Sequence, residues 1–266
     1  MPDHVTYLES KRALDDRALA RGVLSRLESE LPEQPTVLEV GAGTLTMVER
    51  LFEWGVVDAT EWVAVDHDEA ALEAGVRRLD ARADTTSTAA GIRRGATHIE
   101  VVVDDAFTFA EATDRSFDLL VGCAFFDLVD LERAAASFDS VSPLVYAPIT
   151  YDGRTAFEPS DREDDAVLDR YRAHMESYRD GSPDGAAELA SVLESVLADE
   201  PSPWVVEPPY RPGTQVVVEH VIDTIETAVE ETGYDASEWA NRRRTQLDAG
   251  ELRYEASNRD LLGRWR

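Results

Sequence analysis

Buried strand patterns alternate with helical patterns in the first 150 residues, and this alternation limits the possible folds more than any other feature of the chain. Apolar runs that predict strands recur five times, with helical spacing between them. The five runs are Thr36 to Val40, Trp62 to Val65, Ile99 to Val103, Phe117 to Cys123 and Leu144 to Ile149. This order predicts an α/β fold with a doubly wound, mostly parallel sheet, in which ligands bind at the carboxyl ends of the strands.

Helical patterns surround this alternating part of the chain. The predicted organisation is a single domain over residues 1–266, with an N-terminal helical segment (1–34), a core (35–150), a helical cap inserted after the fifth strand (151–200), and C-terminal helices with a last strand (201–266). The predicted cap contains helices over 164–179 and 184–199, and the last strand is expected from Leu252 to Ala256. The small polar residues of 84–97 predict a loop.

The chain is strongly acidic, because 54 Asp and Glu residues against 26 Lys and Arg residues give a formal net charge of −28. Proteins that bind nucleic acids or anionic membranes rely on clusters of Lys and Arg. We therefore expect neither kind of partner. A charge of this size repels itself in dilute buffer, so we expect a protein that works in high salt, as proteins of extreme halophiles do.

Cysteine content and hydropathy predict the cellular location. The single cysteine, Cys123, excludes an internal disulfide. No apolar run reaches the roughly 18 residues that span a bilayer, and the first residues lack the pattern of a signal peptide. We therefore expect a cytoplasmic protein.

The turn after the first predicted strand carries the strongest functional signal. Gly41-Ala42-Gly43 would let the backbone pass close to a ligand, beside the free N–H groups of the next helix. The Gly-Lys-Ser/Thr sequence of a phosphate-binding loop is absent. Three acids accompany the turn: Glu39 just before it, Asp66 at the end of the second strand, and Asp105, followed by Ala106, at the end of the third.

Together the glycine turn and the three acids resemble the class I S-adenosylmethionine-dependent methyltransferases, clearly over residues 35–150. The resemblance implies a Rossmann-like sheet of seven strands and S-adenosylmethionine as the cofactor. It also implies that Gly41, Ala42 and Gly43 wrap the methionine part of the cofactor. Glu39 would hold that turn near the methionine amino group.

The resemblance assigns further residues to the cofactor. Asp66 would accept both ribose hydroxyls, since one carboxylate can accept two O–H donors, and His67 would lie against the adenine or the ribose. Asp105 would accept the adenine amino group, with the backbone N–H of Ala106 on a ring nitrogen. Arg17, on the predicted N-terminal helix, would pair with the methionine carboxylate.

One position departs from the family pattern and leaves alternatives open. Leu45 stands where the family usually has a third glycine. A protein that binds the cofactor without catalysing transfer is therefore one alternative. A nicotinamide-dependent oxidoreductase is another, although Thr46 at the sixth position of the glycine pattern argues against it.

The methyl acceptor is expected beyond the ends of the fourth and fifth strands, and we predict a small molecule. Tyr151 and Asp152 leave the fifth strand and are expected to face the pocket. His174, in the predicted cap, is the candidate general base because the ordinary pKa of histidine is about 6.5. No spacing of His, Asp or Glu demands a metal, so none is expected. The identity of the acceptor, the methylated atom and the oligomeric state stay open.

Overall fold

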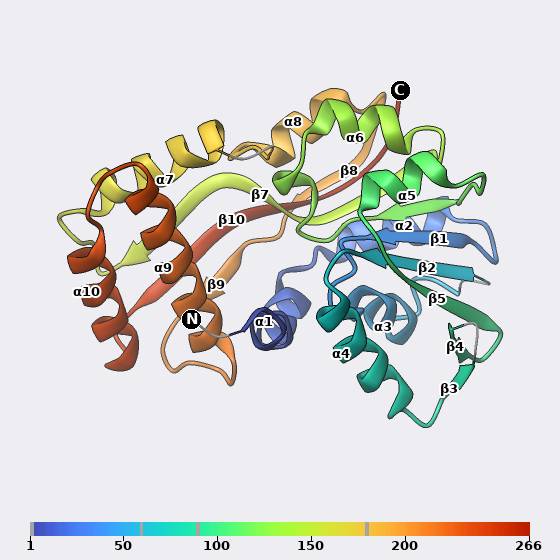
Figure 1. Ribbon diagram of the computed structural model, residues 1–266, viewed down its shortest axis with the longest axis horizontal. Helices are drawn as coiled ribbons and strands as arrows, with labels where there is room; N and C mark the ends of the chain where they lie inside the picture. The colour runs from blue at the N-terminus through green and yellow to red at the C-terminus, as the bar shows by residue number, and fades with distance from the viewer. Residues whose placement is uncertain (1–2, 59–60, 89–90, 179–180) are drawn as a thin grey trace.

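The computed structural model describes residues 3–58, 61–88, 91–178 and 181–266, so the predicted end of a cap helix at residue 179 lies outside the described residues. Five parallel strands form the centre of one sheet (Figure 1). In spatial order they are β5 (Thr97–Val103), β2 (Glu61–Asp66), β1 (Thr36–Val40), β6 (Leu119–Val121) and β7 (Leu144–Glu158). The predicted doubly wound α/β class, with five parallel strands at its centre, is confirmed.

Antiparallel strands extend the sheet at both edges. They are β3 (Thr85–Thr88) and β4 (Gly91–Arg94) beside β5, and β10 (Arg253–Arg264), β8 (Ser195–Pro201) and β9 (Trp204–Val206) beside β7. The described residues thus form ten strands rather than the expected seven. Residues 89–90 of the predicted loop over 84–97 lie outside the described residues. For the rest the prediction was wrong, because Ile92 is buried against Ile99 and pairing with β5 compensates for the polar character of this segment.

Strands β7 and β10 are much longer than the sequence suggested. They pair from Leu144 opposite Arg264 to Glu158 opposite Arg253. In Figure 1 this two-stranded ribbon extends well beyond the parallel core and supports the helices at its outer end. The first residues of the predicted cap are therefore strand, not helix.

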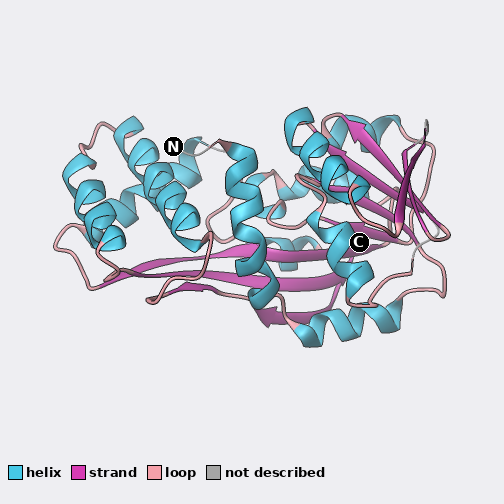
Figure 2. Cartoon of the chain, turned by 90° about the horizontal axis from the view of Figure 1, so that it is seen from below, coloured by secondary structure: helices cyan, strands magenta, loops and turns pink. Residues whose placement is uncertain are grey.

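Helices cover both faces of the sheet, as a doubly wound fold requires. One hydrophobic cluster lies under α1 (His4–Ala18), α2 (Arg21–Glu30), α3 (Thr46–Glu53), α4 (Glu69–Asp80), α7 (Asp164–Tyr178), α9 (Thr214–Glu231) and α10 (Ser237–Asp248). A second cluster lies under α5 (Ala106–Ala112), α6 (Leu131–Phe138) and α8 (Gly185–Val192), next to the short helix η1 (Phe126–Leu128). Figure 2 shows helices gathered along one side of the ribbon at its outer end.

The predicted helical cap is divided between these two faces. Val167 of α7 packs in the first cluster, whereas Ala186 and Leu189 of α8 pack in the second. The predicted helix over 184–199 ends at Val192, and β8 begins at Ser195 and pairs with β10. The residues of this segment favour a helix, but they form a strand because they pair with β10, some 60 residues away in the sequence. Local propensity does not include the effect of such a distant partner.

The N-terminal segment is two helices rather than one. The chain bends at Leu19 and Ala20, where the buried carboxylate of Asp260 accepts a hydrogen bond of 2.8 Å from the backbone N–H of Ala20. In the part of the chain that the structure describes, no helix is long and apolar enough to cross a membrane.

Candidate active site

The glycine turn adopts a backbone conformation that is unfavourable for residues other than glycine. Gly41 and Gly43 have φ angles of +61° and +50°, in the left-handed region that glycine tolerates. A Cβ atom on Gly41 would lie 2.8 Å from the ring of Phe125. The backbone N–H of Ala42 donates to the carbonyl of Val65 on β2 at 3.1 Å, which ties the turn to the neighbouring strand.

Leu45 keeps the backbone conformation expected of the missing third glycine. Its φ is +59°, and its side chain is fully buried under α4. Gly75 of α4 permits this close approach, because a Cβ atom there would lie 2.5 Å from the carbonyl oxygen of Thr44. The left-handed conformation costs Leu45 roughly 1–2 kcal/mol, and burial of its side chain offsets that cost.

Asp66 connects the second strand to the glycine turn. Its Oδ2 accepts a hydrogen bond of 2.7 Å from the N–H of Gly43, and its Oδ1 accepts one of 2.8 Å from the N–H of Asp68. A carboxylate offers about four lone-pair sites, so both oxygens can still accept from a ligand. The side chain is buried and lines the cavity described below, and His67 lies beside it with a mostly exposed ring.

Asp105 begins α5 and presents the first turn of that helix to the cavity. Its Oδ1 accepts from the backbone N–H groups of Phe107 at 3.1 Å and Thr108 at 2.9 Å, and these bonds lower the pKa of Asp105. The N–H of Ala106 belongs to the same first turn, where backbone donors have no acceptor within the helix. Both residues line the cavity.

Glu39 is buried beneath the turn. Only 2% of it is exposed, and the indole N–H of Trp62 donates to its Oε2 at 2.9 Å. Burial raises the pKa of Glu39 from 4.5 to about 8. The folded protein therefore keeps the Glu39 proton at pH values where the unfolded chain has lost it, and this contribution to stability falls as pH rises from about 4.5 to about 8.

Replacing Glu39 by glutamine should remove this pH dependence. Between pH 5 and pH 8.5, the free energy of unfolding of the wild type should fall relative to that of E39Q by on the order of 3 kcal/mol. Urea denaturation at a series of pH values measures the difference. E73Q, at an exposed position on α4, is the control and should follow the wild type. Parallel curves for E39Q and the wild type would contradict the shifted pKa.

The three acids and the glycine turn open onto one cavity of about 700 Å³. This volume falls within the roughly 300–1,000 Å³ of small-molecule sites. The end formed by β1, β2 and β5 carries the predicted cofactor residues Glu39, Gly41, Ala42, Gly43, Asp66, His67, Asp105 and Ala106. The other end lies among α1, α7, α9 and the β7–β10 ribbon, and it is rich in aromatic side chains.

The prediction for Arg17 was wrong. Arg17 lies on an exposed face of α1, does not line the cavity, and donates to the carbonyl of Ala13 at 2.6 Å. Helical periodicity did not reveal which face of α1 turns inward. The cation that α1 supplies to the cavity is Lys11, the only lysine of the chain.

Of the three predicted catalytic residues, only one lines the cavity. Tyr151 lines the cavity, and its hydroxyl lies 3.0 Å from that of Thr155; burial raises its pKa to about 12. Asp152 lies outside the cavity lining and 4.0 Å from Arg259, because successive side chains of a strand point to opposite faces. His174 also lies outside the lining and contacts Glu231 of α9 at 2.6 Å, so it joins two helices. Placing Asp152 and His174 in the pocket was therefore wrong.

Two further residues of the cavity wall have left-handed backbone conformations. Ala124 after β6 and Ile149 in β7 have φ angles of +51° and +56°, and both line the cavity. Asp260, fully buried on β10, holds the bend by accepting from the N–H of Ile149 at 2.9 Å. Such strained backbone often occurs at ligand sites, and it was not visible in the sequence.

Sequence reasoning also missed part of the aromatic end of the cavity. The cavity residues Tyr254, Asn258 and His220, which come from β10 and α9, were not singled out in the sequence. His220 stacks on Tyr7 with ring centroids 4.0 Å apart, and burial lowers its pKa. In the described ranges, no group of three or more His, Cys, Asp or Glu residues could hold a metal ion.

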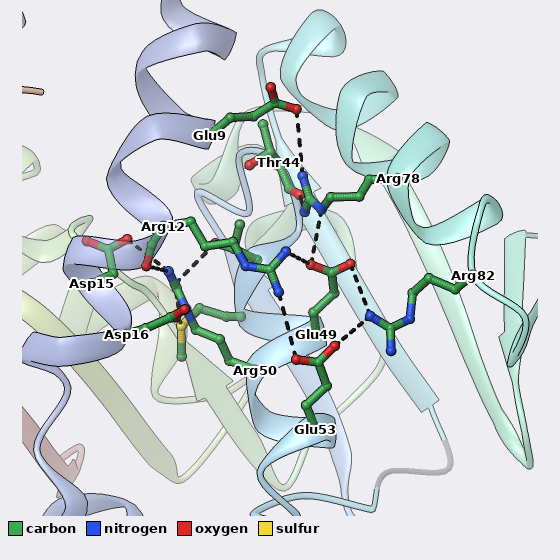
Figure 3. A network of polar contacts seen from close by, with 12 residues as sticks. Glu9, Arg12, Asp15, Asp16, Thr44, Glu49, Arg50, Glu53, Arg78 and Arg82 are labelled. Atoms are coloured by element: carbon green, nitrogen blue, oxygen red, sulfur yellow. Dashed lines mark hydrogen bonds and ion pairs between the residues drawn. The ribbon is translucent and has the colours of Figure 1, made fainter. Parts of the chain in front are cut away.

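A network of charged side chains supports the back of the glycine turn (Figure 3). Glu49 of α3 is 3% exposed and contacts Arg12 of α1, Arg78 of α4, and Arg82, which follows the end of α4. Arg78 also donates to the carbonyl of Thr44 in the turn. The network therefore joins three helices to the backbone that would hold the ligand.

Comparison with known proteins supports the fold. No protein-family model matches the sequence, and neither does any curated protein. Among solved structures, a candidate type II methyltransferase from Anaeromyxobacter dehalogenans superimposes with a TM-score of 0.52 at 19% identity, over 92% of this chain and 96% of that one. The chain has the Rossmann-like methyltransferase fold.

Two other solved structures are similar at lower scores. A geranyl diphosphate methyltransferase has a TM-score of 0.47 at 13% identity, over 95% of this chain and 85% of that one. A cyclopropane-fatty-acyl-phospholipid synthase-like protein from Lactobacillus casei has a TM-score of 0.46 at 14% identity, over 95% and 99% of the two chains. The reaction therefore has to be argued from the site.

Proposed function

We propose that the protein transfers a methyl group from S-adenosylmethionine to a small-molecule acceptor. The observation that carries the proposal is the convergence of the glycine turn with Glu39, Asp66 and Asp105 on one cavity, in the order that the family resemblance implies. When bound, S-adenosylmethionine supplies a methyl group already activated on a sulfonium. The chain itself needs only to bind, align and exclude water.

The residues at the β1, β2 and β5 ends fit the parts of this cofactor. Asp66 has acceptor capacity for the ribose hydroxyls beyond the two hydrogen bonds it already accepts. Asp105 and the N–H of Ala106 offer an acceptor and a donor side by side, as an adenine edge requires. Glu39 offers a buried carboxyl group to the methionine amino group.

The acceptor end of the cavity favours a small molecule. It is enclosed by α1, α7, α9 and the β7–β10 ribbon, and its tyrosines stay protonated because burial raises the pKa values of Tyr7 and Tyr151 to about 12. Both His4 and His220 line the cavity, and we assign to the partly buried His220 the role of proton acceptor that His174 cannot fill. A net charge of −28 argues against a nucleic-acid substrate.

The direct test is transfer of a labelled methyl group. We expect the purified protein to move label from S-adenosylmethionine into the low-molecular-mass fraction of a cell extract, and the boiled extract without protein to show none. Binding of S-adenosylhomocysteine without any transfer would support the alternative of a cofactor-binding protein that has lost catalysis.

The acidic composition supports a second proposal, that the protein works in the concentrated cytoplasm of an extreme halophile. We expect the midpoint of thermal unfolding to rise by at least 10 °C between 0.1 M and 2 M KCl, because salt screens the self-repulsion of 54 acids against 26 bases. Circular dichroism at both salt concentrations measures the shift. A midpoint that is higher in 0.1 M KCl would contradict the proposal.

A further inference from the structure

The aromatic end of the cavity, which we call the acceptor chamber, is walled mainly by aromatic and uncharged side chains. Its walls include Tyr7, Lys11, Tyr151, Trp204, Tyr254 and Asn258. None of the cavity residues that α1, α7, α9, β7, β9 and β10 contribute within the described ranges is acidic. One acid from a neighbouring element, Asp127 of η1, lines the same cavity, and its charge acts on Tyr7 and Tyr151.

Two buried donors in this wall have no hydrogen-bond partner in the part of the chain that the structure describes. The indole Nε1 of Trp204 and the side-chain amide nitrogen of Asn258 have none among the described residues, and the two residues are only 7% and 6% exposed. An unpaired buried donor costs roughly 1–3 kcal/mol, so such groups call for a ligand or a bound water. An indole nitrogen can only donate, so the missing partner of Trp204 is a hydrogen-bond acceptor.

Strand pairing places these donors on one patch of the wall. Trp204 of β9 pairs with Ala256 of β10, and Asn258 is two residues further along β10, on the same face. Diagonal neighbours on antiparallel strands lie roughly 7 Å apart. One oxygen-bearing group of a ligand can therefore reach both donors.

Lys11 adds a positive charge to the same patch. Its Nζ lies 5.4 Å from the centre of the Trp204 ring and donates to Asp15 at 3.0 Å. An ammonium has three donors, so Lys11 has capacity left for a ligand in the cavity it lines. Although burial opposes the charged form, the Asp15 carboxylate contributes to raising the pKa of Lys11 above its usual value.

We propose that the methyl acceptor carries a carboxylate on an apolar or aromatic body, and that Lys11, Trp204 and Asn258 hold this carboxylate while the chamber rings pack against the body. The inference rests on the proposed function and adds the chemical class of the acceptor. Hydrogen bonds from a cation to a carboxylate are roughly twice as strong as neutral ones. A carboxylate therefore satisfies this patch better than a neutral amide does.

A phosphate group fits the patch less well. The charge of Lys11 is already shared with Asp15, and a phosphate ester carries nearly two negative charges at neutral pH. Burying the second charge is costly, because Lys11 is the only Lys or Arg that the described residues contribute to the cavity wall. The chamber should therefore prefer a monoanion.

Calorimetry on protein saturated with S-adenosylhomocysteine tests this preference. The probes are phenylacetate, indole-3-acetate and hexanoate, each beside its primary amide, together with phenyl phosphate. We expect at least one carboxylate to bind at least tenfold more tightly than its amide and than phenyl phosphate. If no carboxylate exceeds its own amide, the proposal is wrong.

Substitutions of Trp204 and Asn258 test whether these side chains bind the carboxylate. W204F removes the N–H and keeps a ring, and N258L removes the amide; each should weaken binding of the preferred carboxylate at least fivefold and leave S-adenosylhomocysteine affinity within twofold. W265F is the matched control, because the Trp265 indole nitrogen is also buried and without a partner in the described chain but lies outside the cavity. Unchanged carboxylate affinity in W204F and N258L would show that water satisfies these donors and would overturn the proposal.

The charge of Lys11 needs its own variant. K11M should weaken the preferred carboxylate at least tenfold and change S-adenosylhomocysteine affinity less than threefold. The reverse pattern would place Lys11 on the methionine carboxylate of the cofactor and contradict its role toward the acceptor. Failure of the wild type to bind S-adenosylhomocysteine at all would instead refute the proposed function, which keeps the two failures distinct.

Discussion

Replacing Asp66 by alanine is expected to weaken binding of S-adenosylhomocysteine by at least 100-fold without unfolding the protein. The two ribose hydroxyls would lose the carboxylate that accepts their hydrogen bonds. Hydrogen bonds to a charged group contribute roughly 1.5–3 kcal/mol each. The glycine turn would also lose its anchor, since Asp66 accepts the N–H of Gly43 at 2.7 Å. Titration calorimetry measures the affinity, and circular dichroism confirms the fold.

The control for this variant lies two residues further along the chain. Asp68 caps α4 by accepting the N–H of Ala71 at 3.1 Å, and it does not line the cavity. D68A should cost about 1 kcal/mol of stability and leave the affinity within threefold. Unchanged affinity in D66A, or an equal loss in D68A, would refute the assignment of Asp66 to the ribose.

Replacing Arg50 by methionine should cost about 3–5 kcal/mol of stability, the loss expected when one partner of a buried ion pair is removed. Arg50 is 1% exposed and donates to Asp15 at 3.1 Å and to Asp16 at 2.6 Å, as Figure 3 shows. It also donates to the carbonyl of Arg12 at 3.0 Å, so it attaches α1 to α3 together with the ion pair between Arg12 and Glu49. Without it, the buried carboxylate of Asp15 keeps only Lys11 as a charged partner among the described residues.

Urea denaturation compares this variant with one at the surface. Arg77 forms an exposed pair with Glu73 on α4, and R77M should change the free energy of unfolding by less than about 1 kcal/mol. If R50M proves as stable as R77M, the network in Figure 3 does not hold α1 in place.

The part of the site built on consecutive strand ends could be predicted from the sequence. Each of Glu39, Asp66 and Asp105 follows or ends a short apolar run, and a parallel sheet brings the ends of such runs to one edge. The glycine turn could be predicted for the same reason, because its conformation depends on residues that are adjacent in the chain. Leu45 could not be understood in this way. The turn accepts a leucine there because Gly75, on α4, leaves room for it.

Features that depend on distant contacts could not be predicted. The pairing of β8 with β10 turned a predicted helix into a strand. Which face of α1 points inward depends on the ion pairs of Arg50, so Lys11 rather than Arg17 reaches the cavity. His174 was an attractive base in the sequence, but its contact with Glu231 of α9 could not be read from its own helix.

The central claim is that the glycine turn and its three acids bind S-adenosylmethionine. Calorimetric titration of the wild type with S-adenosylhomocysteine, and separately with NAD⁺, tests it most directly. We predict saturable binding of S-adenosylhomocysteine in the micromolar range or tighter and no measurable heat with NAD⁺. Tight binding of NAD⁺ with no response to S-adenosylhomocysteine would contradict the claim and favour an oxidoreductase.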